Sequence, residues 1–340
     1  MTSLMAAEVA EIPDAVARLW DRSNAALEDA GRALREREPA VFATIARGSS
    51  DQAAVLFKYA TEIAAGVPVA SIGPSVASVY DAKLKLGGAA SLAISQSGKS
   101  PDIVAAQKSA GEGGALTIAI TNNPDSPLAR EAAHAVDIAA GPERSVAATK
   151  TFVTSAAAGL GLLAHWQEDQ ALLAALHNLP ETLRAALDCD WSSFAQVLAQ
   201  DTSLFILGRG PAFAVAGEAA LKFKETCGMH AESYSAAEVM HGPMALVTPG
   251  FPVLAFAARD RAEPYVVEAV EGLAAKGAAV FATTDKIAAE RQLPFVATGH
   301  PLTDPLALIT AFYRFAEELA RARGLDPDRP PHLRKVTETR

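Results

Sequence analysis

The chain has 340 residues, half of them hydrophobic and 20% charged, which is enough apolar content for about two domains of roughly 150 residues each. Its 39 acidic residues outnumber the 30 Lys and Arg, and the net charge of −9 argues against nucleic acid as the main partner. Cys189 and Cys227 are too few for a disulfide framework and lack metal-ligand spacing, so we expect a reduced, cytoplasmic protein. The acidic N-terminus is unlike a signal peptide. The sequence has no run of about 18 uncharged apolar residues, so we expect no membrane partner.

Apolar residues that recur at intervals of three and four predict an amphipathic helix from Ile12 to about Arg37. From Ala40 onward the pattern changes to short apolar runs, each ended by Gly, Ser, Asn or Pro and followed by a helical stretch. This alternation is typical of a parallel sheet covered by helices on both faces. The expected strands of the first half lie in AVFATIA, VPVASIG, LAIS, ALTIAIT and AVDIAA.

The second half restarts the same alternation after a long helix, predicted from Ala147 to Ala175, and a polar, less regular bridge from Pro180 to Gln200. SLFILGRGPAFAVAGEAALKFKE repeats the strand, Arg-Gly turn and helix of AVFATIARGSSDQAAVLFKYATE. Further strands are expected in PVLAFAA, AAVFATTD and PFVATG, with helices from Glu263 to Lys276 and from Asp304 to Arg323. The shared order of elements indicates duplication of one α/β domain.

A serine-rich turn, Ser95 to Ser100, follows a predicted strand and precedes a helix that begins near Pro101. The start of a helix offers unpaired N–H groups and a positive dipole end, so the turn is a candidate phosphate site. The plain alternative is an ordinary helix cap, with Ser100 at the N-cap and Pro101 at the first helical position. Ligands of open α/β sheets bind at the carboxyl ends of the strands, which favours the phosphate site. Gly48 to Ser50 follow the preceding strand in the same way, so the two turns could converge.

Two features of the second half carry acid–base groups. Lys222 and Glu225 lie three residues apart, so they share one helical face, and their apolar neighbours make burial more plausible than for a solvated surface pair. His241 is followed by Gly242-Pro243, a turn that would hold its imidazole in a loop. Histidine is the commonest general acid or base near neutral pH, although a lone histidine is more often structural.

Six motifs in this order resemble the sugar isomerase (SIS) family over nearly the whole chain, from about Arg37 to Arg340. The motifs are ARGSS, ISQSGKSPD, SVAATKTF, LKFKE, HAESYSAAEVMHGP and DPDRPPHLRKVTETR. The chain is most similar to SIS-type glucosamine-6-phosphate deaminases and to the isomerase half of glutamine:fructose-6-phosphate amidotransferase. This resemblance implies two tandem SIS domains, each a parallel, doubly wound (flavodoxin-like) sheet flanked by helices. We expect a helical segment over residues 1–36, SIS domains over 37–178 and 195–330, and a tail over 331–340 that contributes to the site.

The resemblance also implies a role for each matching residue. Phosphate-binding residues would be Ser95, Gln96, Ser97 and Ser100; sugar-contacting residues would be Gly48, Ser49 and Ser50, with a backbone contact from Val146 and Ala147. Glu225 would move a proton between C1 and C2 of the sugar, supported by Lys222. His241 would open the ring from across a dimer interface, and Lys335 would form an imine with an open-chain ketose.

Two departures from the amidotransferase pattern limit what is implied. Ala148 stands where that pattern has a serine, which removes one hydroxyl contact. Only a short helical segment precedes the first α/β domain, and neither cysteine is near the N-terminus, so we expect no glutaminase domain in this chain.

The first expected function is an amino-sugar-phosphate deaminase that converts glucosamine 6-phosphate to fructose 6-phosphate and ammonia. This chemistry needs acid–base groups and a phosphate anchor but no metal or redox cofactor. The enzymatic alternatives are amination of fructose 6-phosphate and a deglycase for glycated-amine phosphates. A sugar-phosphate sensor is the non-enzymatic alternative, although the acidic N-terminal helix is a poor DNA-binding element. We expect a homodimer with a shared active site, because a histidine in a projecting loop needs a complementary site.

Overall fold

The computed structural model describes residues 2–199 and 201–335, so residues 336–340 of the predicted tail lie outside the described part of the chain. The described chain forms two compact units, each composed of separate stretches. Unit 1 comprises Met1–Glu11, Arg144–Thr149 and Glu181–Leu333. Unit 2 comprises Ile12–Glu143, Lys150–Pro180 and Arg334–Arg340.

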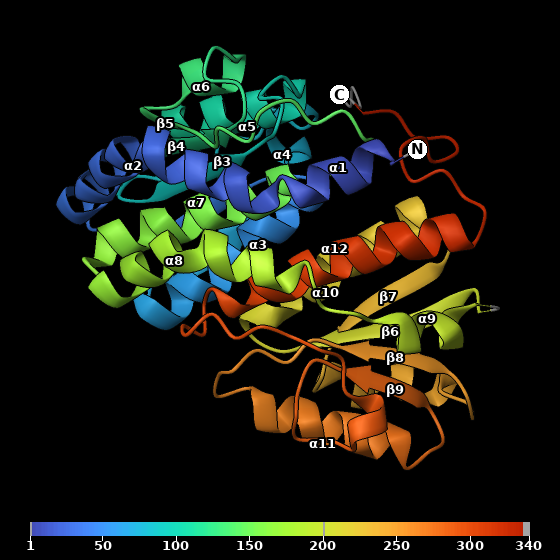
Figure 1. Ribbon diagram of the computed structural model, residues 1–340. Coiled ribbons are helices and arrows are strands. Elements are labelled where there is room, and N and C mark those ends of the chain that lie inside the picture. Colours follow the sequence, from blue (N-terminus) through green and yellow to red (C-terminus); the bar gives the residue numbers. More distant parts are fainter. Residues whose placement is uncertain (1, 200, 336–340) are drawn as a thin grey trace. The chain divides into compact units, whose positions relative to one another are not determined.

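Unit 2 contains a five-stranded parallel sheet in the order β2-β1-β3-β4-β5 (Figure 1). Its strands are β1 (Phe42–Ile45), β2 (Val69–Ser71), β3 (Ala90–Ile94), β4 (Leu116–Thr121) and β5 (His134–Asp137). Its helices are α2 (Ile12–Arg37), α3 (Ser49–Ala64), α4 (Ser75–Ser78), α5 (Pro101–Glu112), α6 (Pro127–Glu131) and α7 (Lys150–Gln167). β1 and β3 are buried along their whole length, as expected for strands covered on both faces.

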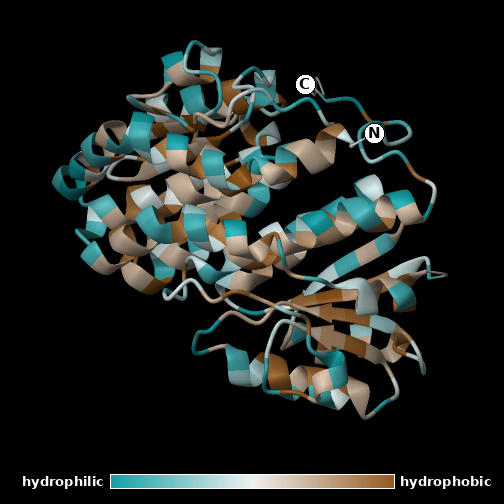
Figure 2. Cartoon of the chain, in the orientation of Figure 1, coloured by the Kyte–Doolittle hydropathy of each residue, from teal (hydrophilic) through white to brown (hydrophobic). Residues whose placement is uncertain are grey.

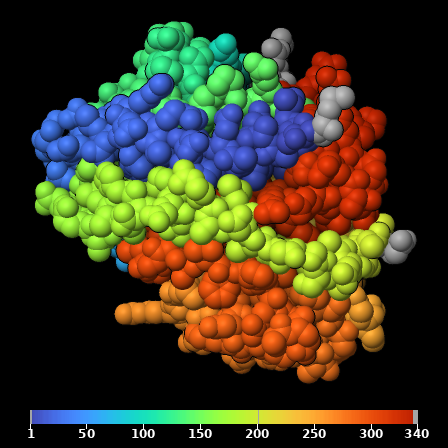
Figure 3. Space-filling view, in the orientation of Figure 1, coloured from blue at the N-terminus to red at the C-terminus, as the bar shows by residue number. Residues whose placement is uncertain are grey.

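The helix α2 has the predicted bounds and is amphipathic, with Leu19, Leu27 and Leu34 buried on one face. That face packs on α7, whose residues are almost all buried and which also packs on α3. The opposite face of α2, in blue in Figure 3, is open to solvent. An apolar cluster on the sheet of unit 2 packs against α5 and α6. It includes Ile45, Ala93, Ile103, Ala106, Ala119 and Leu128.

Unit 1 contains a four-stranded parallel sheet in the order β7-β6-β8-β9, which matches the order of the first four strands of unit 2. Its strands are β6 (Ser203–Gly208), β7 (His230–Ser235), β8 (Pro252–Ala255) and β9 (Ala279–Ala282). Its helices are α1 (Leu4–Ala10), α9 (Ser192–Leu198), α10 (Pro211–Thr226), α11 (Glu263–Ala274) and α12 (Asp304–Ala322), with short 3₁₀ turns η1 (Glu238–Met240), η2 (Pro243–Leu246) and η3 (Ala289–Arg291). Figure 1 shows α10 and α12 on one face of this sheet and α11 on the other.

One core cluster of unit 1 lies between its sheet and α11 and includes Phe205, Leu207, Val253, Val266, Val270 and Val280. The strands β6, β8 and β9 are mostly brown in Figure 2, as their apolar sequences predict. The predicted fold class is therefore confirmed: each unit has a parallel sheet flanked by helices. No helix of the described residues combines the length and hydropathy needed to cross a bilayer.

The structure differs from the predicted local structure in four places. The long helix divides into α7 and α8 (Gln170–Ala186), and the expected irregular bridge contains the end of α8 and all of α9. β7 was not predicted, although it pairs with β6 along its whole length. The segment PFVATG is not a strand. Its Thr298 bonds instead to Asp304 at the start of α12, and its Phe295 ring stacks on Arg259, 3.9 Å from ring centre to guanidinium carbon.

Candidate functional site

The serine-rich turn connects β3 to α5 in unit 2. Gly98 has φ +61°, and a Cβ there would lie 2.2 Å from the Oγ of Ser126, so the turn requires glycine. The Gly98 N–H donates to the Oγ of Ser95 at 3.2 Å. Ser100 is the N-cap of α5 and Pro101 follows at its start, but the Ser100 hydroxyl makes no capping hydrogen bond. The Ile103 N–H donates instead to Oδ1 of Asp102 at 2.9 Å, so the Ser100 hydroxyl does not act as the cap that the plain explanation assigns to it.

A cavity of about 140 Å³ opens beside this turn. It is lined by Arg47, Ser50, Ile94, Ser95, Gln96, Ser97, Ser100, Ile103 and Lys335. The two polar turns meet there because β1 and β3 are parallel neighbours, so their carboxyl ends share one edge of the sheet. The cavity is smaller than the roughly 300 Å³ or more that encloses a whole small-molecule ligand. Its size, hydroxyl groups and two cations suit an anionic group such as a phosphate.

Arg47 is a lining residue that the sequence reasoning did not single out, although it begins the ARGSS motif. Its Nε donates to Oδ2 of Asp102 at 2.6 Å. Asp102 is fully buried in the first turn of α5, so this ion pair fixes the guanidinium beside the serine turn. Asp102 is a second residue that only the structure reveals, since an acid beside a phosphate site has no obvious sequence signal.

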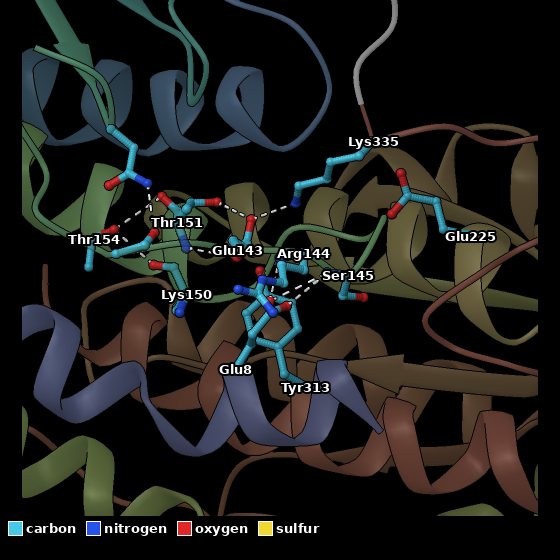
Figure 4. Close-up of polar contacts among 12 residues, drawn as sticks. Glu8, Glu143, Arg144, Ser145, Lys150, Thr151, Thr154, Glu225, Tyr313 and Lys335 are labelled. Atoms are coloured by element: carbon cyan, nitrogen blue, oxygen red, sulfur yellow. Dashed lines mark hydrogen bonds and ion pairs between the residues drawn. The ribbon is translucent and has the colours of Figure 1, made fainter. Parts of the chain in front are cut away.

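Lys335 reaches the same cavity from the C-terminal segment. Its Nζ donates to Oε2 of Glu143 at 2.9 Å, as Figure 4 shows. Glu143 is buried and also accepts hydrogen bonds from Thr151, from its N–H at 3.1 Å and from its hydroxyl at 2.6 Å. These bonds hold the carboxylate in place, and the carboxylate in turn orients the Lys335 ammonium. Glu143 was missed because its neighbours in sequence resemble an ordinary loop.

A second polar cluster lies on α10 in unit 1. Glu218, Lys222 and Glu225 are four and three residues apart, so they share one face of the helix. The Nζ of Lys222 lies 3.5 Å from Oε1 of Glu218 and forms a close ion pair with Glu225. The Tyr313 hydroxyl donates to the same Glu218 oxygen at 2.8 Å. Lys222 and Glu218 are fully buried, so this is not the solvated surface pair that a random helix would present.

Glu225 is the most exposed member of that cluster, with 21% of its side chain accessible. It lines a cavity of about 490 Å³, which is large enough for a sugar-sized ligand. The other lining residues are Leu221, Lys224, Thr226, Gly228, Leu325, Asp326, Pro330, Pro331 and Leu333. A carboxylate that faces such a space while paired with a buried ammonium can take up a proton and return it.

The remaining predicted residues lie elsewhere. Gly48 and Ser49 stand at the start of α3, next to Ser50, but they do not line the cavity beside the serine turn. Val146 and Ala147 belong to unit 1, as do Lys222 and Glu225. His241 is exposed between η1 and η2 and does not line the cavity of Glu225. Within unit 1 the structure therefore joins Lys222 to Glu225 and leaves His241 at the surface.

Comparison with known proteins identifies the family. The model of the SIS domain matches residues 41–164 and 197–290, and the chain belongs to the SIS family. The glutamine–fructose-6-phosphate aminotransferase of Leifsonia xyli subsp. xyli (strain CTCB07) is 35% identical to it, over 98% of this chain and 58% of its own length. The chain thus spans little more than half the length of the curated relatives that it matches.

Two crystal structures extend this comparison. A protein from Silicibacter pomeroyi DSS-3, provisionally described as a phosphosugar isomerase, is 57% identical with a TM-score of 0.93, over 96% of this chain and 100% of that one. The C-terminal domain of glucosamine-fructose-6-phosphate aminotransferase from Francisella tularensis is 26% identical with a TM-score of 0.87, over 97% of this chain and 99% of that one.

Proposed function

We propose that this chain interconverts fructose 6-phosphate and glucosamine 6-phosphate, in the first place by amination of the ketose. The observation that carries the proposal is the buried Lys222 paired with Glu225, whose carboxylate faces a cavity of sugar-like size. The names of the relatives support amination, which stood as an alternative in the sequence reasoning, better than the deaminase that stood first. The match covers about half of the length of those relatives, whose names include glutamine. The use of ammonia as the source of nitrogen is therefore also a proposal.

The phosphate would bind in the cavity of the serine turn. The hydroxyls of Ser95, Ser97 and Ser100 are its hydrogen-bond donors, and Arg47 supplies positive charge. Such anchoring restricts the motion of an open-chain sugar, an entropic contribution that reaches about 7 kcal/mol or more for a well-oriented reaction.

The proton transfer would fall to Glu225. Once C2 carries the imine of ammonia, with its carbonyl oxygen lost as water, Glu225 removes a proton from C1 and returns it to C2. The O1 hydroxyl proton passes to the imine nitrogen, which leaves an amine at C2 and an aldehyde at C1. The Lys222 ammonium offsets the negative charge that develops during this transfer. His241 would exchange protons with the ring oxygen. Lys335, oriented by Glu143, would first form an imine with the C2 carbonyl, which releases water, and ammonia would then displace the lysine amine to give the C2 imine.

The test is a pair of assays in opposite directions: ammonium released from glucosamine 6-phosphate, and glucosamine 6-phosphate formed from fructose 6-phosphate with ammonia or with glutamine. Glu225→Gln should lower both rates about a thousandfold, the usual effect of losing a general base, while fructose 6-phosphate still binds. Glu268→Gln, an exposed change on α11, is the matched control and should keep full activity. Undiminished turnover by Glu225→Gln would remove the residue from this role.

Deamination is the same path in reverse, so the two assays also show which direction the enzyme catalyses faster under matched conditions. Release of a bulkier amine from a glycated-amine phosphate, without reaction of glucosamine 6-phosphate, would indicate a deglycase. Binding of fructose 6-phosphate with no turnover of any amino-sugar phosphate would indicate a sensor.

A further inference from the structure

The short N-terminal helix α1 is anchored at its first turn by the C-terminal part of unit 1. The carboxylate of Asp328 accepts hydrogen bonds from the N–H groups of Leu4 at 2.7 Å and Met5 at 2.8 Å. The N-cap residue Ser3 accepts from the N–H of Ala6 at 2.9 Å and donates its hydroxyl to Glu317 at 2.7 Å. These bonds fix both the position and the direction of α1.

The anchored helix presents Glu8 to the loop Arg144–Thr149, which carries Val146 and Ala147. The Glu8 carboxylate is buried, with 6% of the residue exposed. It accepts a short hydrogen bond from the N–H of Arg144 and a bond from the N–H of Ser145 at 3.2 Å (Figure 4). The next N–H, that of Val146, donates to the backbone carbonyl of Asp328 at 3.4 Å. Three consecutive N–H groups of this loop are thus held by α1 and its anchor residue.

The side chain of Ser145 does little to stabilise this loop. Ser145 is fully buried, and its hydroxyl has no hydrogen-bond partner among the described residues. An unpaired buried hydroxyl is unfavourable, so the loop conformation depends on the bonds to its backbone. Bonds to a carboxylate are stronger than bonds between neutral groups, which makes Glu8 the main restraint on Arg144 and Ser145.

We propose that Glu8 is a positioning residue for sugar recognition: by fixing the backbone of Arg144 and Ser145 it presents Val146 and Ala147 to the substrate. The inference rests on the proposed function and on the backbone contact with the sugar that the family resemblance implies for Val146 and Ala147.

The experiment compares two ligands by calorimetry. Fructose 6-phosphate carries the sugar that Val146 and Ala147 would contact, whereas inorganic phosphate carries none. In Glu8→Gln one acceptor oxygen becomes an N–H₂ group that faces backbone donors, so the affinity for fructose 6-phosphate should fall about tenfold, equivalent to one lost charged hydrogen bond. The affinity for inorganic phosphate should stay the same. In turnover, KM should rise with little change in kcat.

Glu36→Gln removes the same charge from the exposed face of α2 and should alter neither affinity. The inference would be overturned if the affinities for both ligands fell equally, or if the affinity for fructose 6-phosphate did not fall. If Glu8→Gln unfolds below the assay temperature, Asp328→Asn is tested with the same two ligands instead. This change loosens α1 at its anchor, so it should lower the affinity for fructose 6-phosphate alone. Wild-type protein that binds fructose 6-phosphate without turnover would refute the proposed function and leave this binding comparison valid.

Discussion

Asp51 shows how the candidate phosphate site influences a neighbouring residue that is not part of it. The side chain lies in the first turn of α3, next to Ser50, and is partly buried. Burial raises the pKa of Asp51 above its usual value, and the positive charge of Arg47 offsets only part of that effect. The ionised form of Asp51 therefore lowers the stability of the folded protein.

Replacement of Asp51 should have a pH-dependent effect on stability. Below the unfolded-state pKa, near 4, the carboxyl group is protonated in both states and costs nothing. As the pH rises through the window between the unfolded and the raised folded pKa, the wild type loses stability that Asp51→Asn retains. The melting temperature of Asp51→Asn relative to wild type should thus increase from pH 3 to pH 7. The exposed Asp125→Asn is the control, and a constant difference for Asp51→Asn would contradict the prediction.

Residues in motifs could be predicted from the sequence, and residues that orient them could not. The serine turn and the Lys222–Glu225 pair follow from local patterns, since a strand–turn–helix junction and a three-residue spacing are visible in one segment. Glu143 and Tyr313 act through contacts between residues far apart in the chain: Glu143 with Lys335, and Tyr313 with Glu218. No local pattern encodes such pairs.

The packing of α2 on α7 depends on one glycine. A Cβ on Gly31 would lie 2.7 Å from Cβ of His165 and 2.9 Å from the backbone nitrogen of Trp166. Backbone atoms of a buried helix cannot move aside as the end of a flexible side chain can, so the two helices would have to separate.

Gly31→Ala should therefore destabilise the protein by about 1–3 kcal/mol, the usual cost of overpacking a core. Gly272→Ala is the matched control in α11, where the nearest atom to an added Cβ is a methionine methyl group at 3.9 Å. That change should be neutral or stabilising by up to about 1 kcal/mol, because alanine favours helix more than glycine does. Equal melting behaviour of the two variants would show that α2 and α7 tolerate the extra methyl group.

Elements with a strong period were predictable, and elements defined by their partners were not. The amphipathic pattern fixed α2 to the residue, because its charged and apolar positions separate cleanly. PFVATG has the composition of a strand, but its Thr298 is bonded to the start of α12 and its backbone joins no strand of the described residues. β7 has polar residues that read as loop, and it is a strand only because β6 supplies its hydrogen bonds.

At the scale of the whole molecule, the exposure of His241 supports the expected dimer. The loop around it also exposes Met240 and Leu246, at 38% and 65% of their surface. Apolar side chains beside a candidate catalytic histidine are what a contact between subunits would bury. We therefore propose that His241 completes the site of a second copy of this chain.

Subunit exchange tests that arrangement. Glu225→Gln and His241→Asn should each be inactive alone, and a mixture that exchanges subunits should regain about a quarter of wild-type activity per total site if two-fold pairing is random. The same mixture held below the temperature of exchange is the control. A mixture as inactive as its components would place His241 in the site of its own chain.

Unit 1 is assembled from three stretches of chain: the first eleven residues, Arg144–Thr149, and Glu181–Leu333. Hydrogen bonds from Asp328 and Glu8 fasten these stretches to one another. A fusion protein or chimaera that contained only the C-terminal sheet would lack the partners of these hydrogen bonds. Any exchange of modules with a relative must carry the opening helix and the central hexapeptide along with it.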